Sequence, residues 1–360
     1  MRIIRVVLHA VAVPQMNPLA LSAGRSIDAV PHVVVRLFTD TGIEGIGIAY
    51  RLSSTNIHPM LAACQRAAPA VRGLNPAEPE TVRQAVLGTD KPSEELFMAA
   101  SAFDIALWDI QAKDAGLPLY EHLGASRDRV QTYASGDLWR EKTPDQIRDV
   151  VRRHIDAGYR AMKIRIGGAA TPAAEVARVE AARDAAGDDI TILADVNQGW
   201  TPETAINMAD EMLPYRLGWI EDPVHHTDVD GLARVAGQVE VPICAGEHCF
   251  NAAAAAELLD RKAVRVLMID VLRVGGITEW LKIARMAATQ GVPVTSHLTP
   301  EVSVHLMAAI PNGYLAEALP VSQSLFTEPV RVEHGELFAP ERPGIGWELD
   351  ERTIQRFAIS

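Results

Sequence analysis

The chain has 360 residues, of which 48% are hydrophobic, and it carries a formal net charge of −12 at pH 7. A chain of this length and composition can bury a large core and is long enough for a barrel together with a second, smaller domain. The acidic balance argues against a surface for nucleic acid or for an anionic membrane, because both partners need a basic patch.

Three cysteines, Cys64, Cys244 and Cys249, are too few and too unevenly placed for a disulfide framework, and no CxxC pair indicates a zinc site. This usage is typical of the reducing cytoplasm. The apolar N-terminus is interrupted by Arg5 and His9, and no apolar span of about 20 residues follows it. We therefore expect a cytoplasmic protein without a signal peptide or a membrane helix, acting on a small molecule.

Residues 1–125 predict an α+β capping domain. Strand-like runs at Ile3–Val13, His32–Thr39 and Ile43–Tyr50 indicate an antiparallel meander, with an Asp-Thr-Gly turn before the third run. Helical patterns follow at about 57–70, 79–88 and 93–115.

Two connections in this region, 14–28 and 51–56, are polar or irregular, and the first is long enough to cover a site. The closely spaced glycines of 42–47 lack both the GxGxxG spacing and the helix of a dinucleotide fingerprint. Strand and turn chemistry is the better interpretation of these glycines, so no dinucleotide cofactor is expected.

From residue 126 to 320, short apolar runs alternate regularly with helical patterns. The expected strand ends are Ser135, Arg165, Asn197, Asp222, His248, Val271, Leu298 and Ala318. Eight strands with intervening helices predict a β/α barrel with right-handed crossovers, although a helix after the last strand is not clearly indicated. Residues 321–360 are rich in Pro, Gly and short strand signals and are expected to return to the cap.

Three carboxylates stand at a constant spacing in the barrel region. Asp195, Glu221 and Glu247 each end a short apolar run, and successive acids are 26 residues apart (221 − 195 = 26 and 247 − 221 = 26). This spacing is about the length of one strand, one helix and two connections. Any one of them alone could be a helix N-cap or a solvated loop charge, but three acids on neighbouring strand ends would repel one another without a cation. All-oxygen ligands favour Mg²⁺ first and Mn²⁺ second. His248, which follows Glu247 directly, is a candidate to support that ligand.

Further polar residues mark other strand ends. Lys163 and Arg165 are two residues apart on one strand, so both side chains point to the same side. Asp270 and His297 end the sixth and seventh strands, and Glu317 lies on the eighth. A carboxylate beside a histidine can fix the imidazole tautomer and raise its basicity, which marks His297 and Asp270 as a candidate acid–base pair. Other histidines near strand ends, interpreted as structural, are His225, His226, His248 and His305.

This constellation resembles the enolase superfamily, and within it the mandelate racemase subgroup, over nearly the whole chain. The motifs that carry the resemblance are ADVNQ, IEDP and GEH around the three spaced acids, and DVLRVGG beginning at Asp270. The resemblance implies an α/β fold, a modified (β/α)7β TIM-type barrel with an N-terminal α+β capping domain. It also implies that the three spaced acids bind Mg²⁺.

By the same resemblance, the His297 and Asp270 dyad and Glu317 act at the substrate, and Asn197 hydrogen-bonds the substrate near the metal. The two irregular connections of the cap would close over the substrate and set specificity. The muconate lactonising subgroup fits less well, because it places a lysine near the end of the sixth strand, where this chain has Asp270. Barrels of this type commonly assemble, so a homo-oligomer is expected.

The chemistry follows from the charge that must be stabilised. A proton α to a carboxylate is very weakly acidic, because its removal makes an enediolate with two negative charges. Mg²⁺ on one carboxylate oxygen, Lys163 near the other, and Glu317 as a protonated donor are expected to stabilise charge that develops in the transition state. Enzymes of this superfamily use a Lys or His base with Mg²⁺.

Arg165 is the informative departure from the racemase pattern. In the racemase the position two after the first lysine is a second lysine, the base on the face opposite the histidine. A guanidinium has a pKa above about 12 and does not ordinarily lose its proton. A single base, His297, favours a carbon–oxygen lyase that dehydrates a sugar acid to a 2-keto-3-deoxy acid. The alternatives are a racemase or epimerase of a 2-hydroxy acid, and a non-catalytic sugar-acid sensor that keeps the metal site.

Overall fold

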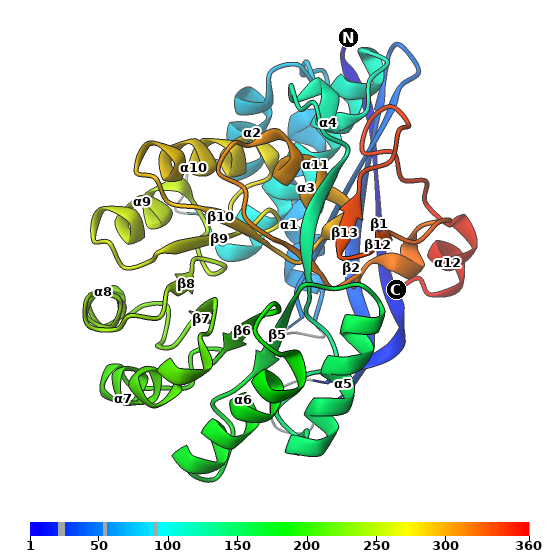
Figure 1. The fold of residues 1–360 in the computed structure, drawn as a ribbon. Coiled ribbons are helices and arrows are strands. Elements are labelled where there is room, and N and C mark those ends of the chain that lie inside the picture. The colour runs from blue at the N-terminus through cyan, green and yellow to red at the C-terminus, as the bar shows by residue number, and fades with distance from the viewer. Residues whose placement is uncertain (21–25, 53–55, 89–91, 360) are drawn as a thin grey trace.

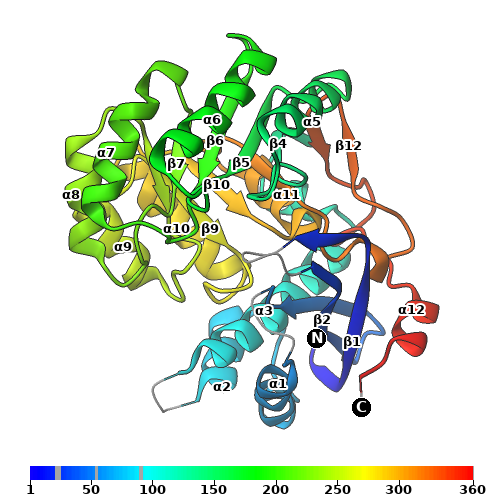
Figure 2. The same cartoon turned by 90° about the horizontal axis from the view of Figure 1, so that it is seen from below.

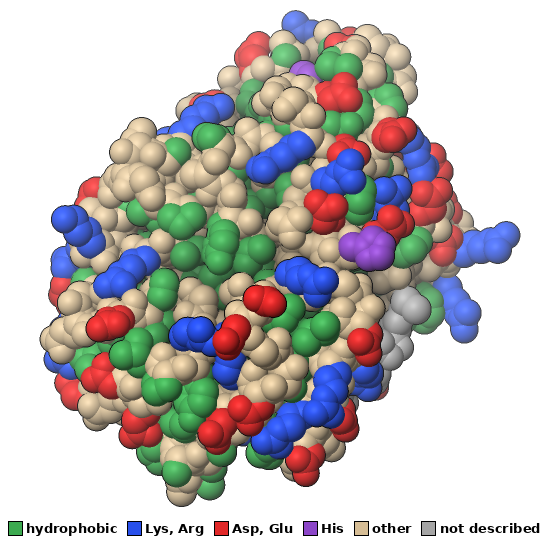
Figure 3. Space-filling view, viewed as in Figure 1, with side chains coloured by type: hydrophobic (Ala, Val, Ile, Leu, Met, Phe, Trp, Pro, Cys, Tyr) green, Lys and Arg blue, Asp and Glu red, His purple; other side chains and the backbone are tan. Residues whose placement is uncertain are grey.

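The computed structural model describes residues 1–20, 26–52, 56–88 and 92–359 of the chain. Two sheets organise it, an antiparallel sheet of three strands near the N-terminus and a larger sheet built mainly of parallel strands (Figure 1). Among the helices of these described segments, none is long and apolar enough to cross a membrane. On the face drawn in Figure 3, Lys and Arg side chains are interspersed with Asp and Glu side chains.

The N-terminal sheet has the order β1-β2-β3, and both strand pairs are antiparallel, as the meander prediction required. The elements of this part are β1 (Ile3–Ala20), β2 (Ser26–Thr39), β3 (Glu44–Tyr50), α1 (His58–Val71), α2 (Pro79–Leu87), α3 (Glu94–Asp114) and α4 (Leu119–His122). The predicted combination of an antiparallel sheet with helices is therefore confirmed.

Two glycines let β3 pack directly on α3. A Cβ atom at Gly45 or at Gly47 would overlap the backbone oxygen of Ala106 or of Ala102, respectively. The helix itself begins after Ser93, whose side chain accepts a hydrogen bond from the first turn. The strand role predicted for these glycines is thus confirmed, and close approach of strand to helix is its physical reason.

The prediction of a loop over 14–28 is wrong for the described part of that range. The β1–β2 ladder continues to the pair Ala20 and Ser26, with one register irregularity on the way. Polar and irregular composition suggested a loop, but strand pairing uses backbone groups, so the ladder tolerates those side chains. Residues 21–25, and residues 53–55 of the second expected connection, lie outside the described residues.

The parallel strands form a barrel of eight strands, β4 to β11, within the described chain. Strands β4 to β10 pair in sequence order. β11 pairs with β4, and Val294 of β10 forms a parallel bridge to Gly313 just before β11, which closes the ring. The strands are β4 (Arg129–Ala134), β5 (Ala161–Arg165), β6 (Thr191–Asp195), β7 (Trp219–Glu221), β8 (Ile243–Ala245), β9 (Val266–Asp270), β10 (Val294–His297) and β11 (Ala316–Ala318).

One α-helix follows each of β4 to β10 and lies on the outside of the barrel (Figures 1 and 2). These helices are α5 (Pro144–Asp156), α6 (Pro172–Ala186), α7 (Pro202–Met212), α8 (Val229–Gln238), α9 (Ala252–Asp260), α10 (Ile277–Thr289) and α11 (Pro300–Ala309). After β11 the described chain has only the short 3₁₀ helix η2 (Gln323–Leu325) before its next strand. This is the predicted (β/α)7β arrangement.

The C-terminal segment contacts both parts of the molecule. β12 (Arg331–Glu333) and β13 (Glu336–Phe338) form a hairpin, and β13 pairs antiparallel with the barrel strand β4. Beyond α12 (Glu351–Arg356), the backbone N of Ile359 donates to Ala10 O in β1 at 2.7 Å. The segment therefore ties the N-terminal sheet to the barrel.

The cap meets the barrel where strands β9 and β10 end. Asp104 of α3 accepts hydrogen bonds from Thr278 N at 2.9 Å and from Thr278 Oγ1 at 2.6 Å, at the start of α10. Tyr50 OH, at the end of β3, lies 3.1 Å from Thr299 Oγ1, two residues after β10. Figure 2 shows β1, β2 and α1 to α3 together on this side of the barrel. The cap thus lies against the edge at which parallel barrels carry their active sites.

Candidate active site

The predicted site residues gather at the C-terminal ends of the barrel strands. Arg165, Asp195 and Glu221 are the last residues of β5, β6 and β7 and lie in register with one another. Asp270 and His297 end β9 and β10 and pair with each other. Parallel strands in register bring their ends to one edge, so residues far apart in sequence form one cluster.

The remaining predicted residues lie at the same edge. Glu247 follows β8 by two residues, Glu317 lies within β11 and Lys163 within β5, and all three are buried. Asn197 is exposed, with a left-handed φ of +51°, and its backbone N donates to Asp195 Oδ1 at 2.7 Å. Asn197 therefore belongs to the outer edge of the cluster.

Lys163 is the buried cation at the base of the cluster. Its Nζ lies 2.8 Å from Glu221 Oε1, 3.0 Å from Glu317 Oε1 and 4.0 Å from Asp195 Oδ2. The same atom lies 5.3 Å from the centre of the Tyr133 ring, which forms the apolar floor below it. Three carboxylates therefore surround the Nζ atom of Lys163.

Arg165 lies beside Lys163, as the two-residue spacing predicted. Its guanidinium forms an ion pair with Asp195 and lies 4.0 Å from Glu221 Oε1. Its Nη2 donates to Ser135 Oγ at 3.4 Å. One carboxylate expected to bind metal is therefore also engaged by this guanidinium.

His297 and Asp270 form the expected dyad. His297 Nδ1 lies 2.7 Å from Asp270 Oδ2, while its Nε2 lies 3.1 Å from Glu247 Oε2. Burial acts to lower the pKa of His297, but the carboxylates of Glu247 and Asp270 outweigh it and raise that pKa above its ordinary value. Asp270 is in turn fixed by the backbone N of Leu272 at 2.7 Å. The imidazole is thereby oriented with Nε2 toward the other acids.

The expectation that Glu317 is a protonated donor is wrong for this arrangement. Burial favours the neutral acid, but Lys163, His297 and Arg165 outweigh burial and lower the pKa of Glu317 to about 2. Its oxygens also accept hydrogen bonds from Ser135 Oγ and from the backbone N of Leu298. Glu317 is therefore a carboxylate at neutral pH and balances the neighbouring cations.

The composition of the cluster fits a divalent cation. Within the described chain the acids at this edge are Asp195, Glu221, Asp222, Glu247, Asp270 and Glu317. The Lys and Arg side chains that contact them are Lys163, Arg165 and Arg273. Carboxylates thus outnumber cations, and a hard divalent ion with oxygen ligands would offset the excess.

Three residues make contacts in the cluster that were not predicted from the sequence. Arg273 lies between the two carboxylates of the His297 side, with Nη1 3.2 Å from Glu247 Oε1 and Nε 3.4 Å from Asp270 Oδ2. Trp219 Nε1 donates to Glu221 Oε2 at 3.2 Å from two residues earlier on β7. Ser135, one residue after the end of β4, donates to Glu317 of β11. Arg273 lies in the DVLRVGG motif and Ser135 at a predicted strand end. Their positions in the sequence could therefore have indicated that both residues lie near the site.

Two family models match the chain. One, described as mandelate racemase / muconate lactonizing enzyme, N-terminal domain, matches residues 3–124. The other, described as enolase C-terminal domain-like, matches residues 146–353. Together they span the cap and the barrel.

Individual relatives are similar over most of the chain. The L-talarate/galactarate dehydratase of Salmonella typhimurium is 31% identical over 91% of this chain and 83% of its own length. A hydrophobic dipeptide epimerase of Enterococcus faecalis is 30% identical over 79% of each chain. The crystal structure of an L-talarate dehydratase from a Polaromonas species, complexed with Mg and L-glucarate, matches with a TM-score of 0.90 at 30% identity. That match covers 100% of this chain and 98% of the other.

Proposed function

The chain belongs to the enolase superfamily, in the mandelate racemase and muconate lactonizing enzyme family, and on this premise we propose that it is a Mg²⁺-dependent sugar-acid dehydratase. It removes the proton α to a carboxylate and expels a β-hydroxyl, so that the product is a 2-keto-3-deoxy acid. The relatives named for talarate and galactarate, and the one crystallised with L-glucarate, support a polyhydroxy acid as the substrate class.

The observation that carries this proposal is the difference between His297 and Arg165. His297 carries an imidazole, which can take up and release a proton, and it is oriented by Asp270 at 2.7 Å. Arg165 occupies the position where a second base would stand, but its guanidinium is paired with Asp195 and does not release a proton. One base on one face suits elimination, in which the same group first takes and then returns a proton.

The proposal assigns Mg²⁺ to Asp195, Glu221 and Glu247. When bound, the ion acts as a Lewis acid toward one carboxylate oxygen of the substrate. Chelation is expected to abolish turnover and Mg²⁺ to restore it, and Asp195→Asn, Glu221→Gln and Glu247→Gln are each expected to give folded but inactive protein. Full turnover by metal-free protein would contradict the assignment.

The proton steps are assigned to His297. Its Nε2 takes the α-proton as the C–H bond breaks, and the electron pair forms the enediolate, whose charge Lys163 helps to balance. The imidazolium then gives this proton to the departing β-hydroxyl as the C–O bond breaks, so water leaves. The resulting enol takes up a proton at the β-carbon and releases its hydroxyl proton, so it becomes the 2-keto acid with no net change in atoms or charge.

A screen of mono- and diacid sugars for 2-keto product in D₂O tests the proposal. We expect a 2-keto-3-deoxy acid from a substrate whose α-proton faces His297, and no deuterium at the α-position of the opposite epimer. The racemase or epimerase alternative instead requires epimer interconversion, α-exchange in both epimers and no keto product. Epimerisation of a 2-hydroxy acid that lacks a β-hydroxyl would decide for that alternative. Saturable sugar-acid binding without α-exchange would indicate a sensor.

We further propose a cytoplasmic homo-oligomer. The three cysteines are buried and free, which suits a reducing compartment. Analytical ultracentrifugation of the protein is expected to give a mass above that of one chain. A monomer at micromolar concentration would contradict the proposed assembly.

A further inference from the structure

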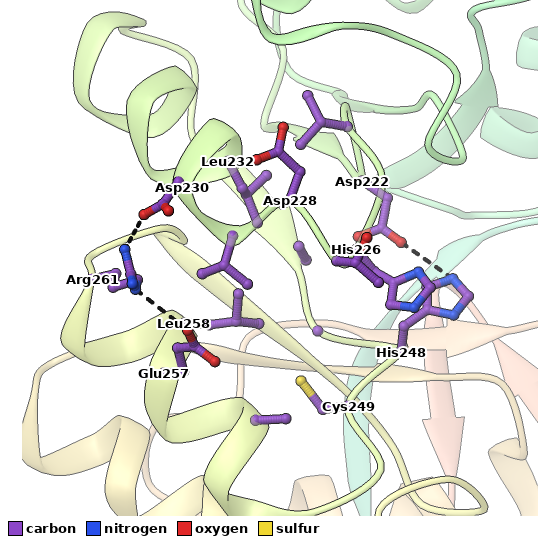
Figure 4. Close-up of a pocket in the computed structure, with 16 residues that line it drawn as sticks. Asp222, His226, Asp228, Asp230, Leu232, His248, Cys249, Glu257, Leu258 and Arg261 are labelled. Carbon is purple, nitrogen blue, oxygen red and sulfur yellow. Dashed lines mark hydrogen bonds and ion pairs between the residues drawn. The ribbon is translucent and has the colours of Figure 1, made fainter. Parts of the chain in front are cut away.

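We propose a second divalent-cation site, formed by Asp222, Glu247 and His248, beside the site proposed for Mg²⁺. One ligand atom from each of these residues can be chosen so that all three lie within 4.8 Å of one another. His248 Nε2 lies 3.1 Å from Glu247 Oε1 and 3.7 Å from Asp222 Oδ2. Figure 4 shows the Asp222 carboxylate directed at the His248 ring, at one end of a cavity of about 340 Å³.

An independent observation is the state of the Asp222 carboxylate. Asp222 is 4% exposed, and its Oδ2 is buried without a hydrogen-bond partner among the described residues. Its backbone has a φ of +40°, a conformation that side-chain-bearing residues rarely adopt. A buried carboxylate oxygen without a donor is costly, and a cation at this position would remove that cost.

The His248 ring presents its Nε2 atom to both carboxylates. Gln198 Nε2 lies 2.8 Å from His248 Nε2, and Arg273 Nη1 lies 3.3 Å from His248 Nδ1, so a donor faces each ring nitrogen. A neutral imidazole has one acceptor nitrogen and cannot accept both bonds. If the ring hydrogen is on Nε2, it points at the amide hydrogens of Gln198 Nε2. If Nε2 carries the lone pair instead, that lone pair faces the carboxylates of Glu247 and Asp222.

The donor set identifies the class of ion. A cation between the three ligand atoms would take the lone pair of Nε2 and one from each carboxylate, in place of the Gln198 amide hydrogen. An imidazole nitrogen with two carboxylate oxygens favours a borderline transition metal such as Zn²⁺, whereas an all-oxygen set favours Mg²⁺. Glu247 would be common to both sites, so occupancy of one site affects the other.

Copper is a probe for this donor set, because a directly bound imidazole is detected by electron spin-echo modulation from its remote nitrogen. With Cu²⁺ at half an equivalent of the full-length protein, we expect this modulation in the wild type. His248→Asn is expected to abolish it, and Asp222→Asn to weaken Cu²⁺ binding about tenfold or more. His226→Asn is the matched control, because the His226 ring stacks on His248 at 4.7 Å but is not in the group of three ligands.

Glu221→Gln separates this proposal from the proposed Mg²⁺ site. Glu221 is outside the second site, so its variant is expected to keep the nitrogen modulation even if it is inactive. All-oxygen copper coordination in the wild type would overturn the second site, as would modulation that persists in His248→Asn or is lost in His226→Asn. Should His248→Asn fail to fold, unchanged copper affinity in Asp222→Asn would overturn the site equally.

Discussion

The two sides of the barrel mouth are built in the same way but can do different chemistry. On the β5 side, the basic side chains of Lys163 and Arg165 are held by Asp195, Glu221 and Glu317. On the β9–β10 side, the central group is the imidazole of His297, which is fixed by the Asp270 carboxylate and can take up or release a proton. The first side can hold and balance charge, whereas the second can also move a proton. This asymmetry is why we favour elimination over two-base racemisation.

The same two sides also differ in how their loops are anchored. After β5, Glu175 Oε2 accepts hydrogen bonds from the backbone N–H groups of Gly167, Gly168 and Ala169 at 2.8 to 2.9 Å. The start of α10, beyond β9, is held instead by Asp104 of the cap. The cation side is therefore anchored within the barrel and the histidine side from the cap.

Replacing His297 by Asn tests the proton-moving side and should have the largest effect. Loss of the imidazole is expected to lower kcat by about 10⁴-fold, because a positioned general base contributes up to about that factor. Steady-state kinetics and α-proton exchange in D₂O measure the loss, with the Tm as a control for folding. Near-normal turnover would show that the two sides are not divided as we propose.

Asp270→Asn should have a smaller effect on the same side. The amide removes the charge that supports the imidazolium and permits the wrong tautomer, so kcat is expected to fall about 10³-fold. The pH profile of kcat should change as well, since Asp270 contributes to the raised pKa of His297. An unchanged profile with unchanged kcat would remove Asp270 from the dyad.

Glu175→Gln tests the anchor of the cation side. It breaks a buried ion pair with Arg178 at 2.6 Å and weakens three charge-assisted hydrogen bonds, so a loss of about 3 kcal/mol in the free energy of unfolding is expected. Urea unfolding measures it. The matched control is Asp149→Asn, which breaks an exposed pair with Arg152 and should leave the Tm unchanged. Equal effects of the two variants would contradict a special role for the Glu175 anchor.

Asp104→Asn tests the anchor of the histidine side through pH. Burial raises the pKa of Asp104 from 3.8 to about 7, so the folded state retains a proton that the unfolded chain loses. The Asp104 carboxyl therefore makes its largest contribution to the free energy of unfolding below about pH 4. That contribution is lost as the pH rises to about 7. We expect the variant to show a shallower decline over this range in urea unfolding. The same slope in both proteins would show that Asp104 does not titrate there.

Arg165→Lys should have the smallest effect, and it would give the β5 side a group that can also move a proton. A buried lysine near other cations can have a pKa shifted toward neutrality, so a second, weak base would appear opposite His297. Slow deuterium exchange at the α-position of the opposite epimer is expected, detected by NMR or mass spectrometry against wild type. Equal exchange of both epimers by the wild-type protein would instead show that Arg165 is no barrier to two-base chemistry.

The architecture and the membership of the site followed from local sequence signals. Alternating apolar runs and helical patterns predicted the barrel, and a constant spacing of 26 residues brought Asp195 and Glu221 to adjacent strand ends in register. These features depend on periodicity along the chain, because one strand, one helix and two connections nearly fix where the next strand ends. The placement of Asp270 and His297 on adjacent strand ends was predicted for the same reason, and the two residues do pair in register.

The pairing within the cluster was decided only by the tertiary structure. The ion pair of Arg165 with Asp195, and the contact of Ser135 with Glu317, join side chains from different strands. Neither pairing is encoded in a local pattern, because each depends on strand order and on how buried charges neutralise one another. The protonation of Glu317 was mispredicted on that account: its pKa is set by Lys163, His297 and Arg165, which are distant in sequence and near only in the closed barrel.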